Sequence, residues 1–278
     1  MTETAKNRFR LKSFGLHGFI LLVTLTVLAG SGFAGDKEAE HANDHHTAHW
    51  TYEGDNGPGH WGELSPAFVI CKTGRHQSPV DIKESKKADK EIAYKVDYKA
   101  SPLKIINNGH TIQVNYAPGS TIAINGKTYQ LIQFHFHHPS EHTFTGKDYP
   151  MELHLVHKND KGELAVVGVF MSEGKENAAI KTIWDNLPDK VNVEKSVPSV
   201  NIDASELLPE MDSLFIYSGS LTTPPCSEDV SWNIVRSHIE VSKAQIDKFT
   251  SVVGKNARPV QPLNDRQLQE SKKTVTAP

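Results

Sequence analysis

The stretch Gln-Phe-His-Phe-His at residues 133–137 constrains the fold of this chain more than any other. Side chains at positions i and i+2 of a β-strand point to the same face, so His135 and His137 share a face and the two phenylalanines lie opposite. Residues 151–157 follow the same alternation and carry His154. If the two stretches pair as neighbouring strands, three imidazoles meet on one face of a sheet.

Three neutral imidazoles suit Zn²⁺, and a fourth tetrahedral position left to water is typical of a catalytic rather than a structural site. A single strand histidine is more often a hydrogen-bonded core or surface residue than a ligand. The flanking residues favour the metal, because a ligating imidazole normally donates its other N–H to an oxygen, and Gln133 and Glu152 each lie two residues before a histidine. We therefore predict a zinc site formed by His135, His137 and His154.

Six motifs resemble the recurring motifs of the α-class carbonic anhydrases and follow in the family's order. They are QSPVDI (77–82), NNGH (107–110), QFHFHHPSEH (133–142), ELHLVH (152–157), LTTPPC (221–226) and RPVQPLNDR (258–266). His138-Pro139 after the second histidine resembles the bacterial members. The resemblance implies a β-dominated α+β fold, with a large twisted, mainly antiparallel central sheet and peripheral helices. It also implies reversible hydration of CO₂ to bicarbonate and a proton.

The resemblance assigns catalytic roles as well. Zinc lowers the pKa of bound water from about 15.7 to about 7, and the resulting hydroxide attacks CO₂. The carbonic anhydrases are the enzymes for which this pKa is usually quoted. By resemblance, Thr222 accepts a hydrogen bond from that hydroxide and donates its own proton to Glu141, which can only accept. His110 matches the family's proton shuttle. Without the resemblance these would be a loop threonine, a surface acid and a turn histidine.

Further residues are expected around the metal. Asn256 matches the position whose backbone carbonyl holds the imidazole of His137. The wall that faces CO₂ is expected to consist of Val156, Val166, Leu221, Val230 and Trp232. The polar wall is expected to include Thr223, Gln113 and Tyr52. By themselves the apolar residues would be interpreted as core. The remaining histidines near the site, at positions 138, 142 and 157, are interpreted as structural.

Residues 1–34 have the pattern of an export signal. Four basic residues precede an uncharged stretch over residues 13–35, and small residues around Ala34 suit signal peptidase. An uncleaved anchor is the alternative, since the stretch is barely long enough to span a bilayer. Cleavage predicts a periplasmic or secreted protein without membrane attachment. A solvated His-rich tail over residues 35–48 would then precede one domain over residues 49–278.

The chain has two cysteines, Cys71 and Cys226, and both follow the export signal. An even count in an oxidising compartment favours one disulfide, with two buried thiols or metal-ligating thiols as alternatives. Removing residues 1–34 takes away four basic residues and one acidic residue, which changes the formal net charge from −3 to −6. An acidic protein gives no electrostatic case for binding nucleic acid.

Short β-rich runs follow one another through the body of the chain. They span residues 103–107, 111–116, 121–124, 128–137, 151–157, 164–171, 213–217 and 230–236. Asn108-Gly109, Pro118-Gly119 and Asn125-Gly126 predict hairpins and mostly antiparallel pairing. Apolar spacing predicts a helix over residues 179–187, and Ser242 with Gln245 forms a capping box ahead of a second helix.

Two other functions fit parts of the sequence. The 15 histidines are compatible with a non-catalytic periplasmic protein that binds or buffers zinc. The combination of Thr222, Glu141 and His110 argues against storage, which would not need them. A zinc hydrolase predicts a glutamate directly after a ligand, as in His-Glu-x-x-His, and this is absent. The resemblance leaves room for minor esterase activity, and implies inhibition by sulfonamides and anions and a homodimer.

Overall fold

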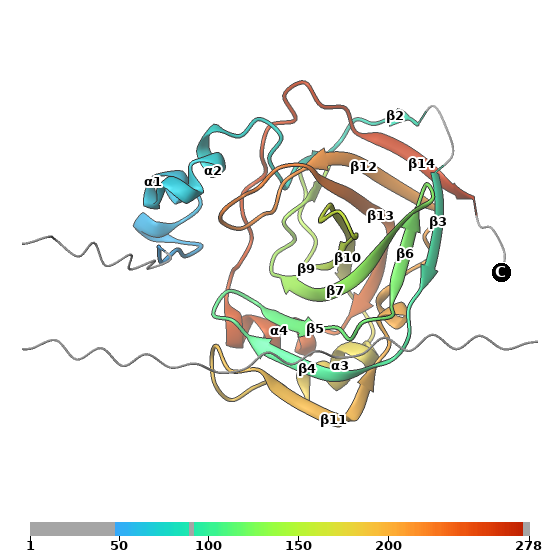
Figure 1. The fold of residues 1–278 in the computed structure, drawn as a ribbon. Coiled ribbons are helices and arrows are strands. Elements are labelled where there is room, and N and C mark those ends of the chain that lie inside the picture. The colour runs from blue at the N-terminus through green and yellow to red at the C-terminus, as the bar shows by residue number, and fades with distance from the viewer. Residues whose placement is uncertain (1–47, 89–91, 275–278) are drawn as a thin grey trace, which may run out of the picture. The chain divides into compact units, whose positions relative to one another are not determined.

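The computed structural model describes residues 48–88 and 92–274 (Figure 1). The predicted export signal and the His-rich tail up to residue 47 lie outside the described residues. All of the described residues belong to one compact unit, which spans Thr47–Pro278. Within these ranges, no helix is both long enough and apolar enough to cross a membrane.

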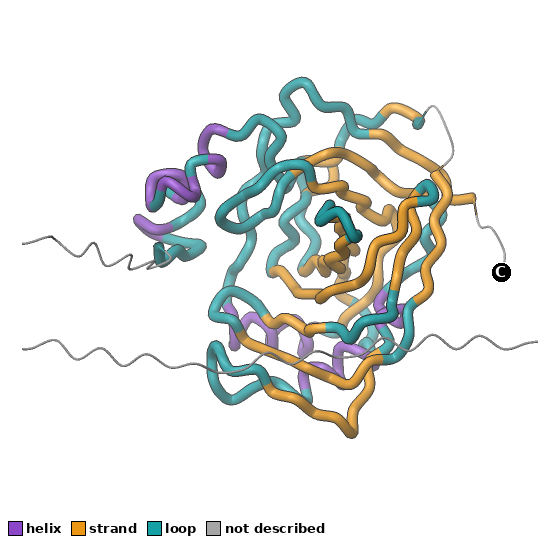
Figure 2. The backbone as a smooth tube through the Cα atoms, in the orientation of Figure 1, coloured by secondary structure: helices purple, strands orange, loops and turns teal. Residues whose placement is uncertain are grey.

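A sheet of twelve strands dominates the fold, as Figure 2 shows by the extent of strand over helix. The strands are β2 (Lys86–Lys87), β3 (Ile92–Asp97), β4 (Ser101–Asn107), β5 (Ile112–Asn115), β6 (Thr121–Ile124), β7 (Lys127–His137), β9 (Met151–Lys158), β10 (Leu164–Glu173), β11 (Lys195–Ile202), β12 (Ser213–Gly219), β13 (Val230–Val241) and β14 (Gln269–Thr274). Two short strands, β1 (Asp81–Ile82) and β8 (Thr143–Phe144), form a separate parallel pair.

The strand order is β11-β4-β5-β7-β6-β3-β14-β12-β13-β10-β9, with β2 beside β14. Because β7 also pairs with β9, the strands from β7 through β6, β3, β14, β12, β13 and β10 to β9 close into a ring. Pairing is mainly antiparallel. Among the parallel pairs, β10 and β13 are paired over the largest number of residues. The predicted fold class is therefore confirmed.

The long strand β7 explains one error in the predicted hairpins. The turns at Asn108-Gly109 and Asn125-Gly126 join antiparallel neighbours, as predicted. Pro118-Gly119 does not form a hairpin: β5 and β6 do not pair with each other within the described ranges, and both pair with β7. Strand β6 pairs with the first part of β7 and β5 with the second part, while β9 occupies the other edge of β7. Strands β5 and β6 therefore follow one another along one edge of β7 and do not fold back on each other.

Helices are short and peripheral. They are α1 (Trp61–Leu64), α2 (Ile70–Thr73), α3 (Ala178–Trp184) and α4 (Lys243–Val253), with 3₁₀ turns at Gly54–Asn56, Pro66–Phe68 and Ala204–Leu207. The predicted capping box begins α4, with reciprocal bonds between Ser242 and Gln245. Helix α3 ends three residues before the predicted end at Leu187, which precedes Pro188; the residue before a proline is disfavoured in helical conformation.

Helices α3 and α4 pack on the face of β7 that does not carry the histidines. Phe134 and Phe136 are fully buried, and the Phe136 ring lies 4.9 Å from that of Trp184 on α3. Trp184 stacks on Phe249 of α4 at 5.7 Å. Burying each phenylalanine stabilises the fold by about 1.5–3 kcal/mol. This packing fixes which face of β7 is core, and therefore which face carries the histidines.

Cys71 and Cys226 form the predicted disulfide, with their Cα atoms 5.0 Å apart. It joins α2 to the loop between β12 and β13, which contains the LTTPPC motif. Trp61 is fully buried in an aromatic cluster with this disulfide, and Trp50 and Tyr52 pack against it. The N-terminal part of the described chain is thereby attached beside residues 221–226.

Candidate metal centre

Three histidines from two adjacent strands meet on one face of the sheet. Strands β7 and β9 pair with His135 directly opposite His154. His135, His137 and His154 each offer a ring nitrogen, and these three atoms lie within 4.8 Å of one another. His137 and His154 are buried and His135 is half-buried. The period-2 alternation of the two stretches and their pairing as neighbours are as the sequence predicts.

Each imidazole is held by an oxygen at its second ring nitrogen. The pairs are His135 Nδ1 with Gln133 Oε1 (2.8 Å), His137 Nδ1 with the Asn256 carbonyl (2.8 Å) and His154 Nε2 with Glu152 Oε1 (2.9 Å). Because these oxygens accept, each nitrogen in the pairs carries the proton, and the opposite nitrogen keeps a lone pair. One of these, His137 Nε2, is buried and has no hydrogen-bond partner among the described residues. Such a donor set fits a metal ion.

Burial and charge act differently on the three imidazoles. Burial lowers the pKa of His135 well below its ordinary value, and burial also lowers the pKa of His137, against the smaller opposing effect of the Glu141 charge. Both side chains are therefore neutral near pH 7 and able to bind a cation. For His154, burial also acts to lower the pKa, but the charge and hydrogen bond of Glu152 outweigh it and raise the pKa.

Glu152 is a buried centre of hydrogen bonds behind the histidines. Its Oε1 accepts from His154 and from His142 Nδ1 at 2.8 Å, and its Oε2 accepts from the backbone N–H groups of Glu141 and His142 at 2.9 and 2.8 Å. Burial acts to raise the pKa of Glu152, but the two imidazoles and their hydrogen bonds outweigh it and lower the pKa. The carboxylate therefore stays ionised and holds the orientation of His154.

The sequence identifies His142 as structural but does not indicate its partners in this arrangement. Its ring lies between Glu152 and Tyr217, with His142 Nε2 and Tyr217 Oη 2.7 Å apart. Tyr217 in turn donates to Ser78 Oγ at 2.8 Å. No local pattern could have indicated this contact, because Tyr217 comes from β12 and lies 75 residues further along the chain.

Glu141 lies at the metal centre, but it does not bond Thr222. Its Oε1 accepts from the Arg258 backbone N–H at 2.9 Å. Its Oε2 lies 3.5 Å from His137 Nε2 and 3.8 Å from His154 Nδ1, with no hydrogen-bond partner in the described part of the chain. No hydrogen bond joins Thr222 to Glu141 among the described residues, and Glu141 Oε2, which is directed at the imidazoles, keeps its capacity to accept one.

Asn256 connects the metal centre to the turn that carries His110. Its carbonyl holds His137, as the resemblance implies, and its side-chain Nδ2 donates to the His110 carbonyl at 3.0 Å. Asn108 Oδ1 accepts from the backbone N–H of His110, which shapes the turn. The His110 ring stacks on Trp50 with centroids 3.7 Å apart and an angle of 8°. Burial, with a smaller contribution from His49, lowers the pKa of His110.

The predicted apolar wall forms one cluster. Its members are Val156, Val166, Leu221, Val230 and Trp232. Val166 pairs with Val156 on one side and with Trp232 on the other, and the Trp232 ring lies 4.8 Å from that of His154. The apolar surface therefore reaches the third histidine.

The three predicted polar residues come from different parts of the chain. Gln113 lies opposite His135 in the β5–β7 register. Thr223 is half-buried, and its carbonyl accepts from the N–H of Cys226 at 2.8 Å. Tyr52 lines a cavity of about 390 Å³ together with Glu141. Burial raises the pKa of Tyr52, with a smaller contribution from the Glu141 charge, so the phenol remains protonated.

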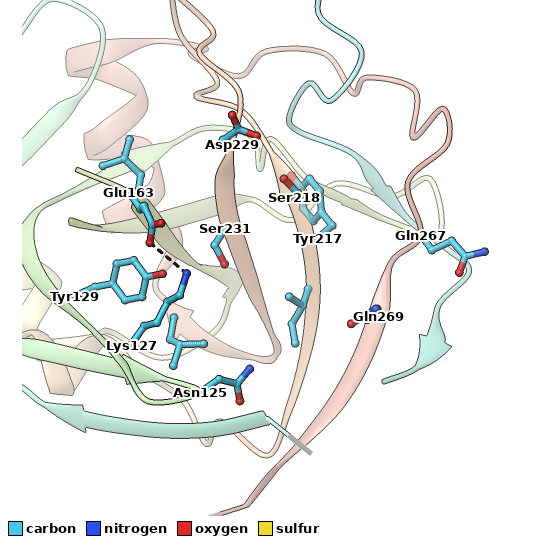
Figure 3. A pocket seen from close by; sticks show the side chains of 13 residues that line it. Asn125, Lys127, Tyr129, Glu163, Tyr217, Ser218, Asp229, Ser231, Gln267 and Gln269 are labelled. Atoms are coloured by element: carbon cyan, nitrogen blue, oxygen red, sulfur yellow. Dashed lines mark hydrogen bonds and ion pairs between the residues drawn. The ribbon is translucent and has the colours of Figure 1, made fainter. Parts of the chain in front are cut away.

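A separate cavity of about 580 Å³ contains none of the predicted site residues (Figure 3). Polar side chains from β7, β12, β13 and β14 and from neighbouring turns line it. Lys127 and Glu163 form an ion pair at 3.3 Å within it. None of the three histidines lines this cavity, although Tyr217, which contacts His142, does.

Together, a mainly antiparallel sheet and three imidazoles on adjacent strands define a β-protein with a single candidate three-histidine metal centre among its described residues. The chain belongs to the eukaryotic-type carbonic anhydrase family, whose model matches residues 56–272. The carbonic anhydrase of Nostoc sp. is 48% identical over 230 residues, which cover 81% of this chain and 87% of the relative. That of Neisseria gonorrhoeae is 44% identical over 251 residues, covering 90% and 96%.

A solved structure of the same kind supports the assignment. The α-carbonic anhydrase from Thermovibrio ammonificans, in complex with sulfanilamide, is 44% identical and superposes with a TM-score of 0.75. The match covers 80% of this chain and 99% of that one.

Proposed function

We propose that this protein is a zinc-dependent carbonic anhydrase, which catalyses the reversible hydration of CO₂ to bicarbonate and a proton. Carbonic anhydrase activity follows from membership of the family. The observation that supports zinc at His135, His137 and His154 is the set of three ring nitrogens within 4.8 Å, each opposite a nitrogen held by an oxygen acceptor. When bound, zinc acts as a Lewis acid that lowers the pKa of its bound water to near 7.

The chain's own groups would orient the reactants. Thr222 is buried in the loop after β12, and we assign it to accept a hydrogen bond from the attacking water and to donate its hydroxyl proton to Glu141. Glu141 Oε2 is the acceptor available for that bond, since it has no hydrogen-bond partner among the described residues. A carboxylate can only accept, so the lone pairs of the threonine would be left for the nucleophile.

CO₂ is apolar and would lie against the wall formed by Val156, Val166, Leu221, Val230 and Trp232. Gln113, Thr223 and Tyr52 would line the opposite, polar side and hold water for proton transfer. Such a division places the substrate on a dry surface and the departing proton on a wet one.

Cellular placement and partners are part of the same proposal. Residues 1–34 would be an export signal, residues 35–48 a His-rich tail and residues 49–278 the catalytic domain. The disulfide between Cys71 and Cys226 is consistent with an oxidising compartment such as the periplasm. Since the Thermovibrio ammonificans relative was solved with sulfanilamide, we propose that sulfonamides and small anions bind here too. A homodimer is proposed from the bacterial resemblance alone.

Removing the metal is the direct test of this function. CO₂ hydration would be followed by stopped flow on the zinc-loaded protein, after treatment with a chelator, and after zinc is restored. We expect activity to be lost and regained with zinc, and to be blocked by sulfanilamide. A protein that binds zinc and hydrates no CO₂ would instead favour the zinc-buffering alternative.

Replacing His110 with alanine should lower kcat in weak buffer by on the order of tenfold or more, because proton transfer out of the site would lose its relay. kcat/KM should be unchanged, and added imidazole buffer should restore much of kcat. The His110-dependent part of kcat requires the neutral imidazole, which predominates above its pKa. Because that pKa lies below the ordinary 6.5, this part should persist below pH 6.5 and fall only at lower pH. Full turnover of His110→Ala in weak buffer would contradict the relay.

A further inference from the structure

A row of three polar side chains runs along the face of the sheet that carries the metal centre. Its first two members, Gln113 and Asn115, lie on β5. In the β5–β7 register Gln113 is opposite His135, and Asn115 is opposite Gln133. Residues directly opposite in antiparallel strands place their side chains on the same face. Both amides therefore lie on the histidine face, and both are half-buried.

The row ends at a carboxylate from outside β5. Gln113 Nε2 donates to Asn115 Oδ1 at 2.6 Å, and Asn115 Nδ2 donates to Glu194 Oε2 at 2.6 Å. Glu194 directly precedes β11, so it approaches from a different part of the chain. Because a carboxylate only accepts, Asn115 must turn its NH₂ group toward Glu194 and its oxygen toward Gln113. Gln113 must then turn its own NH₂ group toward Asn115.

The direction of the hydrogen bonds in this row decides whether Gln113 presents its carbonyl oxygen or its NH₂ group to the site. An amide has nearly the same shape after its oxygen and nitrogen are exchanged, so two amides alone could bond in either direction. With Glu194 at the end, Gln113 keeps its carbonyl oxygen, an acceptor, for the site. The neighbouring Gln133 is oriented in the opposite sense, because its own oxygen is committed to His135 Nδ1. The histidine face of the sheet thus carries one amide with a free oxygen and, diagonally across the two strands, one amide with a free NH₂ group.

We propose that Glu194 is a positioning residue for proton transfer, which acts by fixing Gln113 as a hydrogen-bond acceptor on the wall of the site. The proposal rests on the function proposed above. Gln113 lies three residues after His110 and opposite His135, so it borders the path from the metal centre to the proposed relay. Water molecules that carry a proton along such a path need a consistent donor and acceptor order, and a fixed acceptor sets that order.

The test reverses the direction of the hydrogen bonds in the row. Glu194→Lys places an obligate donor at its end, so that Asn115 and Gln113 should both turn around and Gln113 should present its NH₂ group. Glu194→Gln can donate or accept and should have a smaller effect. Each change is made in the wild-type chain and in a Gln113→Ala background, where the row no longer reaches the site. Stopped-flow CO₂ hydration gives kcat in weak buffer, kcat in imidazole buffer and kcat/KM for each protein.

For Glu194→Lys we expect kcat in weak buffer to fall by roughly two- to tenfold, with kcat/KM within about twofold and recovery in imidazole buffer. In the Gln113→Ala background the same change should have little effect, because the pathway through Gln113 is gone. Unchanged kcat, or an equal loss in both backgrounds, would overturn the proposal while leaving the enzyme function intact. An inactive wild-type protein would overturn the proposed function and this inference together.

Discussion

Replacing His137 with alanine is expected to remove most zinc binding and to bring CO₂ hydration close to the uncatalysed rate. His137 supplies one of three ring nitrogens within 4.8 Å, and its Nε2 has no hydrogen-bond partner among the described residues. Protein zinc sites have apparent binding free energies of about 10–16 kcal/mol, so losing one of three ligands should cost roughly 3–5 kcal/mol. Affinity should therefore fall by on the order of 10²- to 10⁴-fold.

Zinc content after dialysis against a chelator of known affinity, together with stopped-flow hydration, measures both effects. A matched control is His238→Ala, since His238 is an exposed histidine on β13 outside the cluster. It should keep full zinc content and full activity. Stoichiometric zinc with undiminished hydration in His137→Ala would show that the three-histidine cluster is not the catalytic centre.

The geometry of the ligands could be predicted because it depends on a local rule. Alternation along a strand places His135 and His137 on one face wherever the strand goes, and a second alternating stretch supplies His154. The only long-range step was the pairing of β7 with β9. One register satisfies the burial of Phe134 and Phe136 on the opposite face, since a shift by one residue would exchange the two faces.

Contacts between distant segments could not be predicted in this way. The hydrogen bonds that link Glu152 to Tyr217 through His142 depend on the position of β12. The row of hydrogen bonds from Gln113 through Asn115 to Glu194 depends on the position of the segment before β11. The sequence around Glu194 has exposed lysines and valines without a strong strand pattern, and β11 was not predicted at all. The Pro118-Gly119 turn shows the same limit, since nothing in its local sequence indicates that β5 and β6 both pair along one edge of β7 and not with each other.

The other large effect is expected at Glu152, whose removal should weaken both the fold and the metal site. The buried carboxylate accepts four hydrogen bonds, two from imidazole nitrogens and two from backbone N–H groups. Glu152→Ala would leave these donors buried without an acceptor. Breaking a buried charged network of this kind typically costs about 3–5 kcal/mol, a large part of the roughly 5–15 kcal/mol by which proteins are stable.

Zinc affinity should also fall, by about 10- to 100-fold, because His154 would lose the acceptor that fixes its orientation. Glu152→Gln keeps the shape but brings an NH₂ group toward N–H donors, so it should lie between wild type and alanine. Urea unfolding of the metal-free proteins measures the first effect, and competition with a chelator measures the second. Glu206→Ala, at an exposed position, is the control and should change stability by less than about 0.5 kcal/mol. If metal-free Glu152→Ala unfolds at the same urea concentration as wild type, the buried carboxylate does not stabilise the fold in the way its four hydrogen bonds indicate.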